Sequence, residues 1–209
     1  MAHESSALTR KEYFNEAARN WDKKYYTPQL MARLEKLVPE FGLKLGQKIL
    51  DAGTGTGVLI PFLLRIIGPS GSITAIDYAE NMIKVFRSKF SGISNVTVEL
   101  KNIEELDYFS ESFDAAICFG LFPHLERKER ALSHLSRVLK QGGRLVISHA
   151  LSSAEIRAHH KDSSPVAKDT LPEDKEMRRL LEQAGFMEIQ ITDEPGYYLC
   201  TAIKGYQVH

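Results

Sequence analysis

The chain has 209 residues, of which 43% are hydrophobic and 26% charged, and its 27 basic and 27 acidic side chains give a formal net charge of zero. This composition is typical of a globular protein with a sizeable core and excludes disordered and collagen-like chains. The balanced charge argues against a nucleic-acid partner, which normally requires a basic excess. The longest apolar run, residues 58–67, is too short to span a membrane and contains Pro61 and Arg65, so we expect no membrane insertion.

The amino-terminal residues contain no apolar segment of the kind found in a signal peptide. Cys118 and Cys200 lie in apolar stretches, where we expect small buried side chains in a reducing compartment. These features predict a cytoplasmic protein, and the length predicts one domain.

The first predicted elements are two helices, a strand and a third helix. Apolar residues recur at helical spacing over residues 11–21 and again over residues 28–38. A short apolar strand at residues 48–51 ends in Asp51 and runs into a glycine-rich turn. Helix-like apolar sequence follows at once, over residues 58–67.

Strands and helices then alternate. A β-branched strand at residues 72–76 ends at Asp77, and a helix is predicted for residues 79–90. Strands at residues 95–100 and 113–119 precede a helix at 126–140, which we expect Gly142 and Gly143 to stop before a strand at 144–148. The alternation predicts a mostly parallel sheet covered on both faces.

The carboxyl-terminal third begins with a polar stretch, residues 151–170, that has no stable period after His160. Pro172 is predicted to open a helix with a buried stripe that reaches Ala184, and Gly185 to end it. Residues 186–191 and 197–204 are predicted to form a final antiparallel hairpin.

A ligand of a parallel sheet binds at the carboxyl ends of its strands. One such end carries a glycine-rich turn, in which Gly53, Gly55 and Gly57 follow Asp51 and precede a helix. Glycines let the backbone turn tightly and approach a ligand closely. Asp77 lies about 20 residues past the turn, at the end of the next strand, where an acid can accept hydrogen bonds from ribose hydroxyls. This context predicts a nucleotide site.

The spacing of the turn favours one nucleotide over others. A dinucleotide fingerprint needs a third glycine where this chain has Val58, and no Gly-Lys-Ser/Thr of a phosphate-binding loop follows. Asp51 would repel a pyrophosphate, whereas it would attract a sulfonium and an α-ammonium group. The turn therefore favours S-adenosylmethionine over NAD.

Five segments together resemble the class I S-adenosylmethionine-dependent methyltransferases, and among them the type 11 group of ubiquinone- and menaquinone-biosynthesis-like enzymes. The segments are residues 13–25, 49–57, 68–83, 112–125 and 135–148. The resemblance implies a Rossmann-like three-layer sandwich. Its seven-stranded, mostly parallel sheet would have the order 3-2-1-4-5-7-6, with strand 7 antiparallel and a helical lid at the amino terminus.

The resemblance also implies a cofactor site. The methionine part would be held by the first glycine turn, at Asp51, Ala52, Gly53, Thr54 and Gly55. Asp77 would bind the ribose, and the adenine would lie against Tyr78, Met82, Asn102 and the backbone N–H of Ile103. Asn102 stands where many relatives have Asp, and its side-chain oxygen can still accept a hydrogen bond from the adenine amino group. Phe119 and Gly120 would lie beneath the reacting methyl group.

Histidines near the predicted strand ends are candidates for a general base, which a neutral methyl acceptor can require. The catalytic candidates are His124, His149 and His160, and the acceptor-binding candidates are Trp21, Tyr25, Phe122 and His159. Instead of acting as a base, His124 could cap the next helix or touch the cofactor. The other histidines could face the substrate or be solvated. A metal held by His124, His149 and one of His159 and His160 is a further alternative, although zinc-ligand spacing is absent and no metal is predicted.

We therefore predict one methyltransferase domain over residues 1–209. It would comprise a lid (1–40), a cofactor-binding core (41–150), an acceptor-side loop and helix (151–172) and a carboxyl-terminal helix and hairpin (173–209). It would move a methyl group from S-adenosylmethionine to a small-molecule acceptor by in-line displacement and release S-adenosylhomocysteine. A homodimer is possible. The alternatives are a non-catalytic binder of the same nucleotide, a metal-assisted methyltransferase for thiols or metalloids, and an NAD-dependent oxidoreductase.

Overall fold

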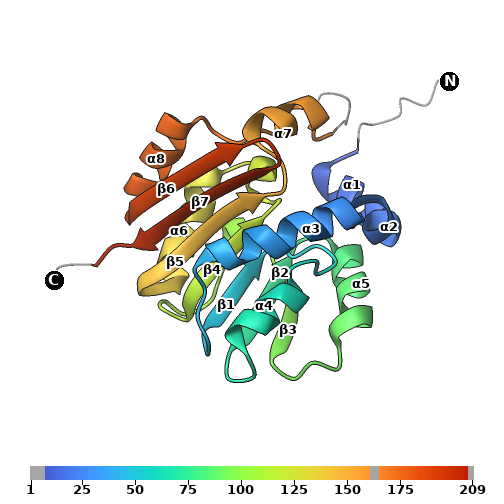
Figure 1. Ribbon diagram of the computed structural model, residues 1–209, viewed down its shortest axis with the longest axis horizontal. Helices are drawn as coiled ribbons and strands as arrows, with labels where there is room; N and C mark the ends of the chain where they lie inside the picture. The colour runs from blue at the N-terminus through green and yellow to red at the C-terminus, as the bar shows by residue number, and fades with distance from the viewer. Residues whose placement is uncertain (1–7, 161–164, 207–209) are drawn as a thin grey trace.

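The structure, a computed structural model, describes residues 8–160 and 165–206. One seven-stranded sheet runs through the molecule with helices on both of its faces (Figure 1). The strand order is β3-β2-β1-β4-β5-β7-β6, which confirms the order predicted from the resemblance. No helix within the described ranges is long and apolar enough to cross a membrane.

The strands pair as expected for this order. Their bounds are β1 Lys48–Ala52, β2 Ser72–Asp77, β3 Val96–Leu100, β4 Phe113–Phe119, β5 Leu139–His149, β6 Phe186–Glu194 and β7 Tyr197–Lys204. The first five strands pair with one another in parallel, and β7 is antiparallel to both β5 and β6. The carboxyl ends of β1, β2, β4 and β5 therefore meet at one edge of the sheet.

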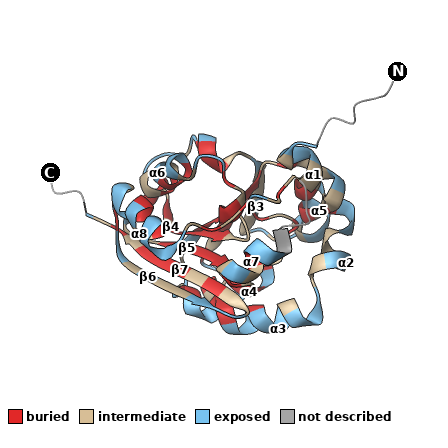
Figure 2. Cartoon of the chain, turned by 90° about the horizontal axis from the view of Figure 1, so that it is seen from above, coloured by how far each residue is buried: buried red, intermediate tan, exposed pale blue. Residues whose placement is uncertain are grey.

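The helices cover the sheet from both sides. Their bounds are α1 Arg10–Ala17, α2 Trp21–Tyr25, α3 Pro28–Leu37, α4 Ile60–Ile67, α5 Glu80–Phe90, α6 Lys128–Val138, α7 Ser153–His160 and α8 Asp174–Gln183. Successive residues of a strand point to opposite faces, so Ile49 packs in the cluster that includes α3 and α4, and Leu50 in the cluster that includes α6 and α8. The buried residues accordingly concentrate in the strands (Figure 2).

Two predicted helices end differently in the structure. The first is interrupted by a 3-10 turn, Ala18–Asn20, that separates α1 from α2. The expectation that Gly142 and Gly143 stop the helix predicted at residues 126–140 is wrong, because α6 ends at Val138 and both glycines lie inside β5. Leu139 leaves the helix in an extended conformation, is fully buried and pairs with Phe113 of β4. Burial of this side chain in the sheet outweighs the local helical pattern.

The amino-terminal helices lie beside the carboxyl ends of the strands (Figure 1). A capping box between Thr9 and Glu12 begins α1, and Thr27 caps α3, which has Pro28 in its first turn. Asn81 at the start of α5 donates two hydrogen bonds to Asn15 of α1. Its backbone N–H donates to the Asn15 side-chain oxygen at 2.8 Å, and its side-chain amide donates to the Asn15 carbonyl at 3.0 Å. These contacts hold the helices over the edge at which a ligand of this fold would bind.

The carboxyl-terminal elements follow the prediction with shifted bounds. Helix α8 begins at Asp174 rather than at Pro172, and it buries Met177, Leu180 and Leu181 against the sheet. The β6–β7 hairpin is antiparallel, as predicted, and β6 extends to Glu194. Cys118 and Cys200 are buried and free, which confirms their predicted core positions.

Candidate functional site

A cavity of about 600 Å³ opens at the carboxyl ends of β1, β2, β4 and β5 and is bordered by the amino-terminal helices. Every residue predicted to bind the cofactor lines it except Ala52, which is fully buried in β1. Trp21, Tyr25, His124 and His149 of the predicted acceptor side also line it. The tertiary structure thus brings the two predicted groups of residues to one cavity.

The glycine turn has the backbone conformation that its sequence predicts. Gly53 and Gly55 have φ of +71° and +56°, a region that favours glycine. The N–H groups of Gly53 and Thr54 donate to the carbonyl of Ile76 at 2.9 and 3.0 Å, which ties the turn to β2. A Cβ at Gly53 would lie 2.8 Å from the side chain of Leu121, whereas a Cβ at Gly55 would meet nothing within 4 Å. The turn is therefore packed on one side at Gly53 and open at Gly55.

Two buried carboxylates flank this turn. Asp51 is 2% exposed and accepts a hydrogen bond from the Thr54 hydroxyl at 2.6 Å. Burial raises the pKa of Asp51 to about 6; the Thr54 hydrogen bond opposes the rise and the nearby Asp77 carboxylate adds to it. Burial also raises the pKa of Asp77, although the backbone N–H groups of Ala79 and Gly55, each at 2.9 Å, favour its charged form.

The chemistry of these carboxylates fits S-adenosylmethionine. Within the described ranges, no Lys or Arg side chain is hydrogen-bonded to Asp51 or Asp77, whose partners are the Thr54 hydroxyl and the backbone N–H groups of Gly55 and Ala79. Two buried negative charges without a basic partner are costly unless a ligand supplies positive charge or hydrogen-bond donors. A sulfonium and an α-ammonium would supply the charge at Asp51, and ribose hydroxyls would supply donors to the lone pairs that remain on Asp77.

The predicted adenine end of the cavity is formed by residues after β2 and β3. Met82 is buried, and the ring of Tyr78 lies 6.3 Å from that of Phe14 in an edge-on contact. The side-chain oxygen of Asn102 accepts a hydrogen bond from the N–H of Glu104 at 3.0 Å. An amide oxygen has two lone pairs, so one remains for the adenine amino group that Asn102 is predicted to bind.

A hydrogen-bond network joins the lid to the glycine turn. The Tyr26 hydroxyl donates to the Thr56 hydroxyl at 2.5 Å, and Thr56 in turn donates to Asp22. The ammonium of Lys89 on α5 contacts Asp22 Oδ2 at 2.7 Å and the carbonyl of Thr56 at 2.8 Å. The rings of Trp21 and Tyr25 pack at 4.4 Å on the same helix. The segment around α2, which belongs to the predicted lid, is therefore attached to the loop that is predicted to hold the cofactor.

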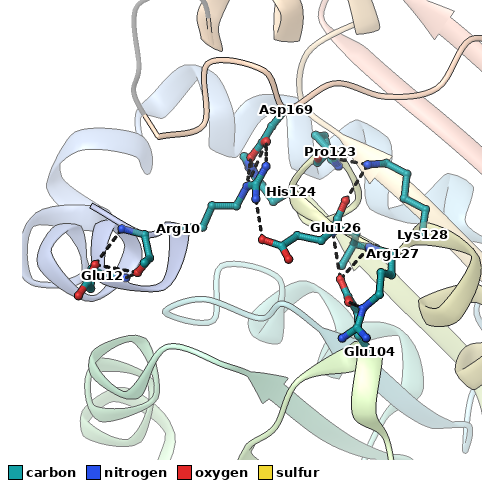
Figure 3. Close-up of polar contacts among 11 residues, drawn as sticks. Arg10, Glu12, Glu104, Pro123, His124, Glu126, Arg127, Lys128 and Asp169 are labelled. Atoms are coloured by element: carbon teal, nitrogen blue, oxygen red, sulfur yellow. Dashed lines mark hydrogen bonds and ion pairs between the residues drawn. The ribbon is translucent and has the colours of Figure 1, made fainter. Parts of the chain in front are cut away.

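His124 is held by a buried acid from a distant segment. Its Nδ1 lies 2.8 Å from Asp169 Oδ2, and Asp169 Oδ1 accepts from Arg10 Nη2 at 2.6 Å (Figure 3). Arg10 also pairs with Glu126 at 2.8 Å. Burial alone would raise the pKa of Asp169, but the hydrogen bonds from His124 and Arg10 outweigh it and lower the pKa to about 2. Asp169 is thus a carboxylate at neutral pH.

His149 has a different hydrogen-bond pattern. Its Nδ1 accepts the backbone N–H of Leu151 at 3.0 Å, and its ring is stacked on Phe119 at 6.3 Å. A neutral imidazole whose Nδ1 is an acceptor carries its hydrogen on Nε2. His149 can therefore donate a hydrogen bond from Nε2, and this geometry favours a binding role over proton removal at that atom.

One residue predicted to bind the acceptor, Phe122, does not line the cavity. Phe122 is 1% exposed and packs in the core cluster that includes α6, so the structure does not place it against an acceptor. The side chains of His159 and His160 lie outside the described residues. In the part of the chain that the structure describes, no group of three or more His, Cys, Asp or Glu side chains is arranged to hold a metal ion.

Sequence reasoning missed the residues that hold the acceptor side together. Arg10, Asp169 and Glu104 lie in three segments that are distant in the sequence. Glu104 is buried and accepts the N–H groups of Glu126 and Arg127, which fixes the turn after His124. Asp169 lies in a polar stretch with no period, so only its tertiary contacts distinguish it from a solvated acid.

The chain matches the methyltransferase domain family over residues 43–185. It is 41% identical over 110 residues to a ubiquinone/menaquinone biosynthesis C-methyltransferase of Psychromonas ingrahamii, an alignment that covers 51% of this chain and 43% of that protein. It is 27% identical over 186 residues to a demethylmenaquinone methyltransferase of Staphylococcus aureus, an alignment that covers 78% of this chain and 77% of that protein. The chain thus spans less than half of the length of the first of these relatives.

Solved structures show the same fold. A S-adenosylmethionine-dependent methyltransferase from Aquifex aeolicus superimposes with a TM-score of 0.72 at 26% identity, over 91% of this chain and 98% of that one. A phosphoethanolamine N-methyltransferase 2 from Haemonchus contortus superimposes with a TM-score of 0.74 at 16% identity, over 95% of this chain and 61% of that one. The second likeness concerns the fold alone. Sequence, sheet order and cavity agree, and the chain belongs to the class I S-adenosylmethionine-dependent methyltransferase family.

Proposed function

We propose that this protein transfers a methyl group from S-adenosylmethionine to a small-molecule acceptor. The observation that carries the proposal is the pair of buried carboxylates, Asp51 and Asp77, that flank the glycine turn without a basic partner among the described residues. They open onto one cavity of about 600 Å³, in the usual size range of small-ligand sites. The cavity suits a cationic nucleoside and a compact acceptor together.

The residues of the chain have distinct roles in this proposal. When bound, the cofactor supplies a methyl group on a positively charged sulfur. Asp51 and the backbone of Gly53 and Gly55 hold the methionine part, and Asp77 holds the ribose. Tyr78 and Met82 pack against the adenine, and the Ile103 N–H and the Asn102 oxygen pair with its edge. Positioning supplies much of the rate of a displacement with a good leaving group.

The acceptor would occupy the side of the cavity that the lid covers. Phe14, Trp21 and Tyr25 give this side an aromatic surface, and Phe119 and Gly120 form its floor at the end of β4. His149 would donate a hydrogen bond to the acceptor, and His124 would take up its proton. The printed names of the curated relatives refer to ubiquinone and menaquinone biosynthesis, which supports a small-molecule acceptor.

Calorimetric titration with S-adenosylhomocysteine tests the cofactor assignment. We expect micromolar binding by the wild-type chain, and binding at least tenfold weaker by Asp77→Ala, since a lost hydrogen bond to a charged group costs about 1.5–3 kcal/mol. Asp174→Asn, at an exposed carboxylate paired with Arg178, serves as the matched control and should bind as wild type does. NADH should not bind.

Three results would count against the proposal. Equal affinity of the wild type and Asp77→Ala would remove Asp77 from the site. Binding of NADH in place of S-adenosylhomocysteine would favour an oxidoreductase. Tight binding of S-adenosylmethionine without methylation of any compound in a broad acceptor screen would favour a non-catalytic binder.

A further inference from the structure

Three segments of the chain meet at one buried carboxylate. Asp169 lies between α7 and α8, Arg10 is the first residue of α1, and His124 follows β4 (Figure 3). The side chain of Asp169 is 2% exposed. It accepts two hydrogen bonds from Arg10 Nε and Nη2, at 3.0 and 2.6 Å, and contacts His124 Nδ1 at 2.8 Å. Nothing in the local sequence pattern predicts this arrangement.

The arrangement determines which nitrogen of His124 carries the hydrogen. A carboxylate accepts hydrogen bonds and cannot donate them, so Nδ1 of His124 must be the donor to Asp169. The lone pair of the neutral ring is then on Nε2. At His149 the backbone N–H of Leu151 enforces the opposite tautomer. The two histidines that line the cavity are thus set for different tasks.

Packing fixes the ring of His124 as well as its tautomer. The ring of Phe14 on α1 meets it edge-on at 5.2 Å, and only 13% of the side chain is exposed. Among the described residues, the charged groups of the surrounding elements include Asp169, Arg10, Glu126 and Lys128, with the Tyr78 phenol nearby. Among them, Asp169 is the acid in hydrogen-bond contact with the ring.

We infer that Asp169 is a positioning residue for methyl transfer, which holds His124 with Nε2 as the proton acceptor while Arg10 holds Asp169. This inference rests on the proposed function. In the step, the nucleophilic atom of the acceptor forms a bond to the methyl carbon, and the carbon–sulfur bond breaks with its electron pair left on sulfur. The proton of the acceptor passes to Nε2 of His124, and Asp169 stabilises the imidazolium without being protonated.

The inference restricts the acceptor to molecules that lose a proton on methylation. A hydroxyl, a thiol or an acidic C–H group meets this requirement, whereas a tertiary amine does not. Arg10 belongs to the lid and Asp169 to the segment before α8, so their ion pair also joins two borders of the cavity across the histidine. The proton acceptor is therefore oriented when the lid is in the position seen here.

Nitrogen-15 NMR of the imidazole rings tests the inference directly. In the wild-type chain saturated with S-adenosylhomocysteine, His124, assigned by its loss in His124→Gln, should carry its hydrogen on Nδ1. In Asp169→Asn the population with the hydrogen on Nε2 should rise, because an amide can donate to Nδ1 as well as accept from it. The matched control is Glu126→Gln, which removes the other carboxylate on Arg10 and should leave the tautomer of His124 unchanged.

Kinetics supply the second readout. Catechol, dithiothreitol and N,N-dimethylaniline, offered with radiolabelled S-adenosylmethionine, represent a hydroxyl, a thiol and a tertiary amine. For each compound that the wild type methylates, Asp169→Asn should lower kcat at least tenfold and change KM for S-adenosylmethionine less than twofold. Asp169→Glu should recover part of the loss.

The outcomes separate this inference from the proposed function. Hydrogen on Nε2 of His124 in the wild type, an unchanged tautomer or kcat in Asp169→Asn, or methylation of the tertiary amine alone would overturn the role of Asp169. Absence of S-adenosylhomocysteine binding by the wild type would instead refute the proposed function. The tautomer of the wild-type ring can be measured even if Asp169→Asn does not fold.

Discussion

Asp51→Asn should make the cofactor-free protein more stable while it weakens the cofactor site. The Asp51 carboxyl group is buried at the end of β1, where its partner is the Thr54 hydroxyl. The amide that replaces it is uncharged, and its oxygen can accept the same hydrogen bond. The substitution therefore removes a buried charge with little change in shape.

The size of the effect follows from the pKa. Burial raises the pKa of Asp51 from 3.8 to about 6. Because the native pKa lies above the unfolded value, ionisation costs stability: the penalty is absent below pH 4, grows between pH 4 and 6 and is complete above pH 6. A pKa difference of about two corresponds to about 3 kcal/mol. Asp51→Asn should raise the free energy of unfolding by up to this amount at pH 8, and the gain should disappear toward pH 4.

Urea denaturation of the cofactor-free protein at pH 8, 6 and 4 measures this gain. Calorimetry at pH 8 should show affinity for S-adenosylmethionine at least tenfold lower in Asp51→Asn, since the carboxylate no longer faces a cationic ligand. Wild-type affinity should itself fall as the pH drops through 6 and Asp51 is protonated. The matched control is Asp174→Asn, which removes an exposed i,i+4 ion pair with Arg178. This pair should contribute roughly 0.5 kcal/mol or less to the free energy of unfolding. Equal or lower stability of Asp51→Asn at pH 8 would refute the view that this charge is held at a cost.

Further predictions concern the glycine turn, the core and the lid. Gly53→Ala should lower the free energy of unfolding more than Gly55→Ala: both positive φ values add strain of about 1 kcal/mol, but only at Gly53 would the Cβ overlap a neighbouring side chain. Equal losses in urea denaturation would contradict this. Phe122→Ala should cost about 3–5 kcal/mol of stability, as expected for a core ring, and an unfolding free energy like the wild type's would show that the ring is not core. Tyr26→Phe should remove the hydrogen bond to Thr56, about 1 kcal/mol, and hydrogen exchange in α2 should quicken; unchanged exchange would argue against this lid anchor.

The fold, and the grouping of the residues predicted to bind the cofactor, could be predicted from the sequence alone. The strand that ends at Asp51, the glycine turn and the acid at Asp77 lie within 30 residues of one another, and their roles depend on local backbone geometry. A pattern of this kind can be recognised in the sequence without knowledge of tertiary contacts. The parallel sheet and the position of these residues at its ligand-binding edge were predicted from this pattern, whereas the strand order was implied by the family resemblance.

The surroundings of His124 and Phe122 became visible only in the folded structure. The partner of His124 is 45 residues away at Asp169, and that of Asp169 is 159 residues away at Arg10. Likewise, Phe122 was predicted to touch the acceptor, yet the packing of α6 buries it in the core. An isolated histidine, acid or aromatic residue has the same local pattern in a core, on a surface or in a site. Its role is set by long-range packing, because the desolvation and the hydrogen-bond partners that give it a chemical task exist only after the chain has folded.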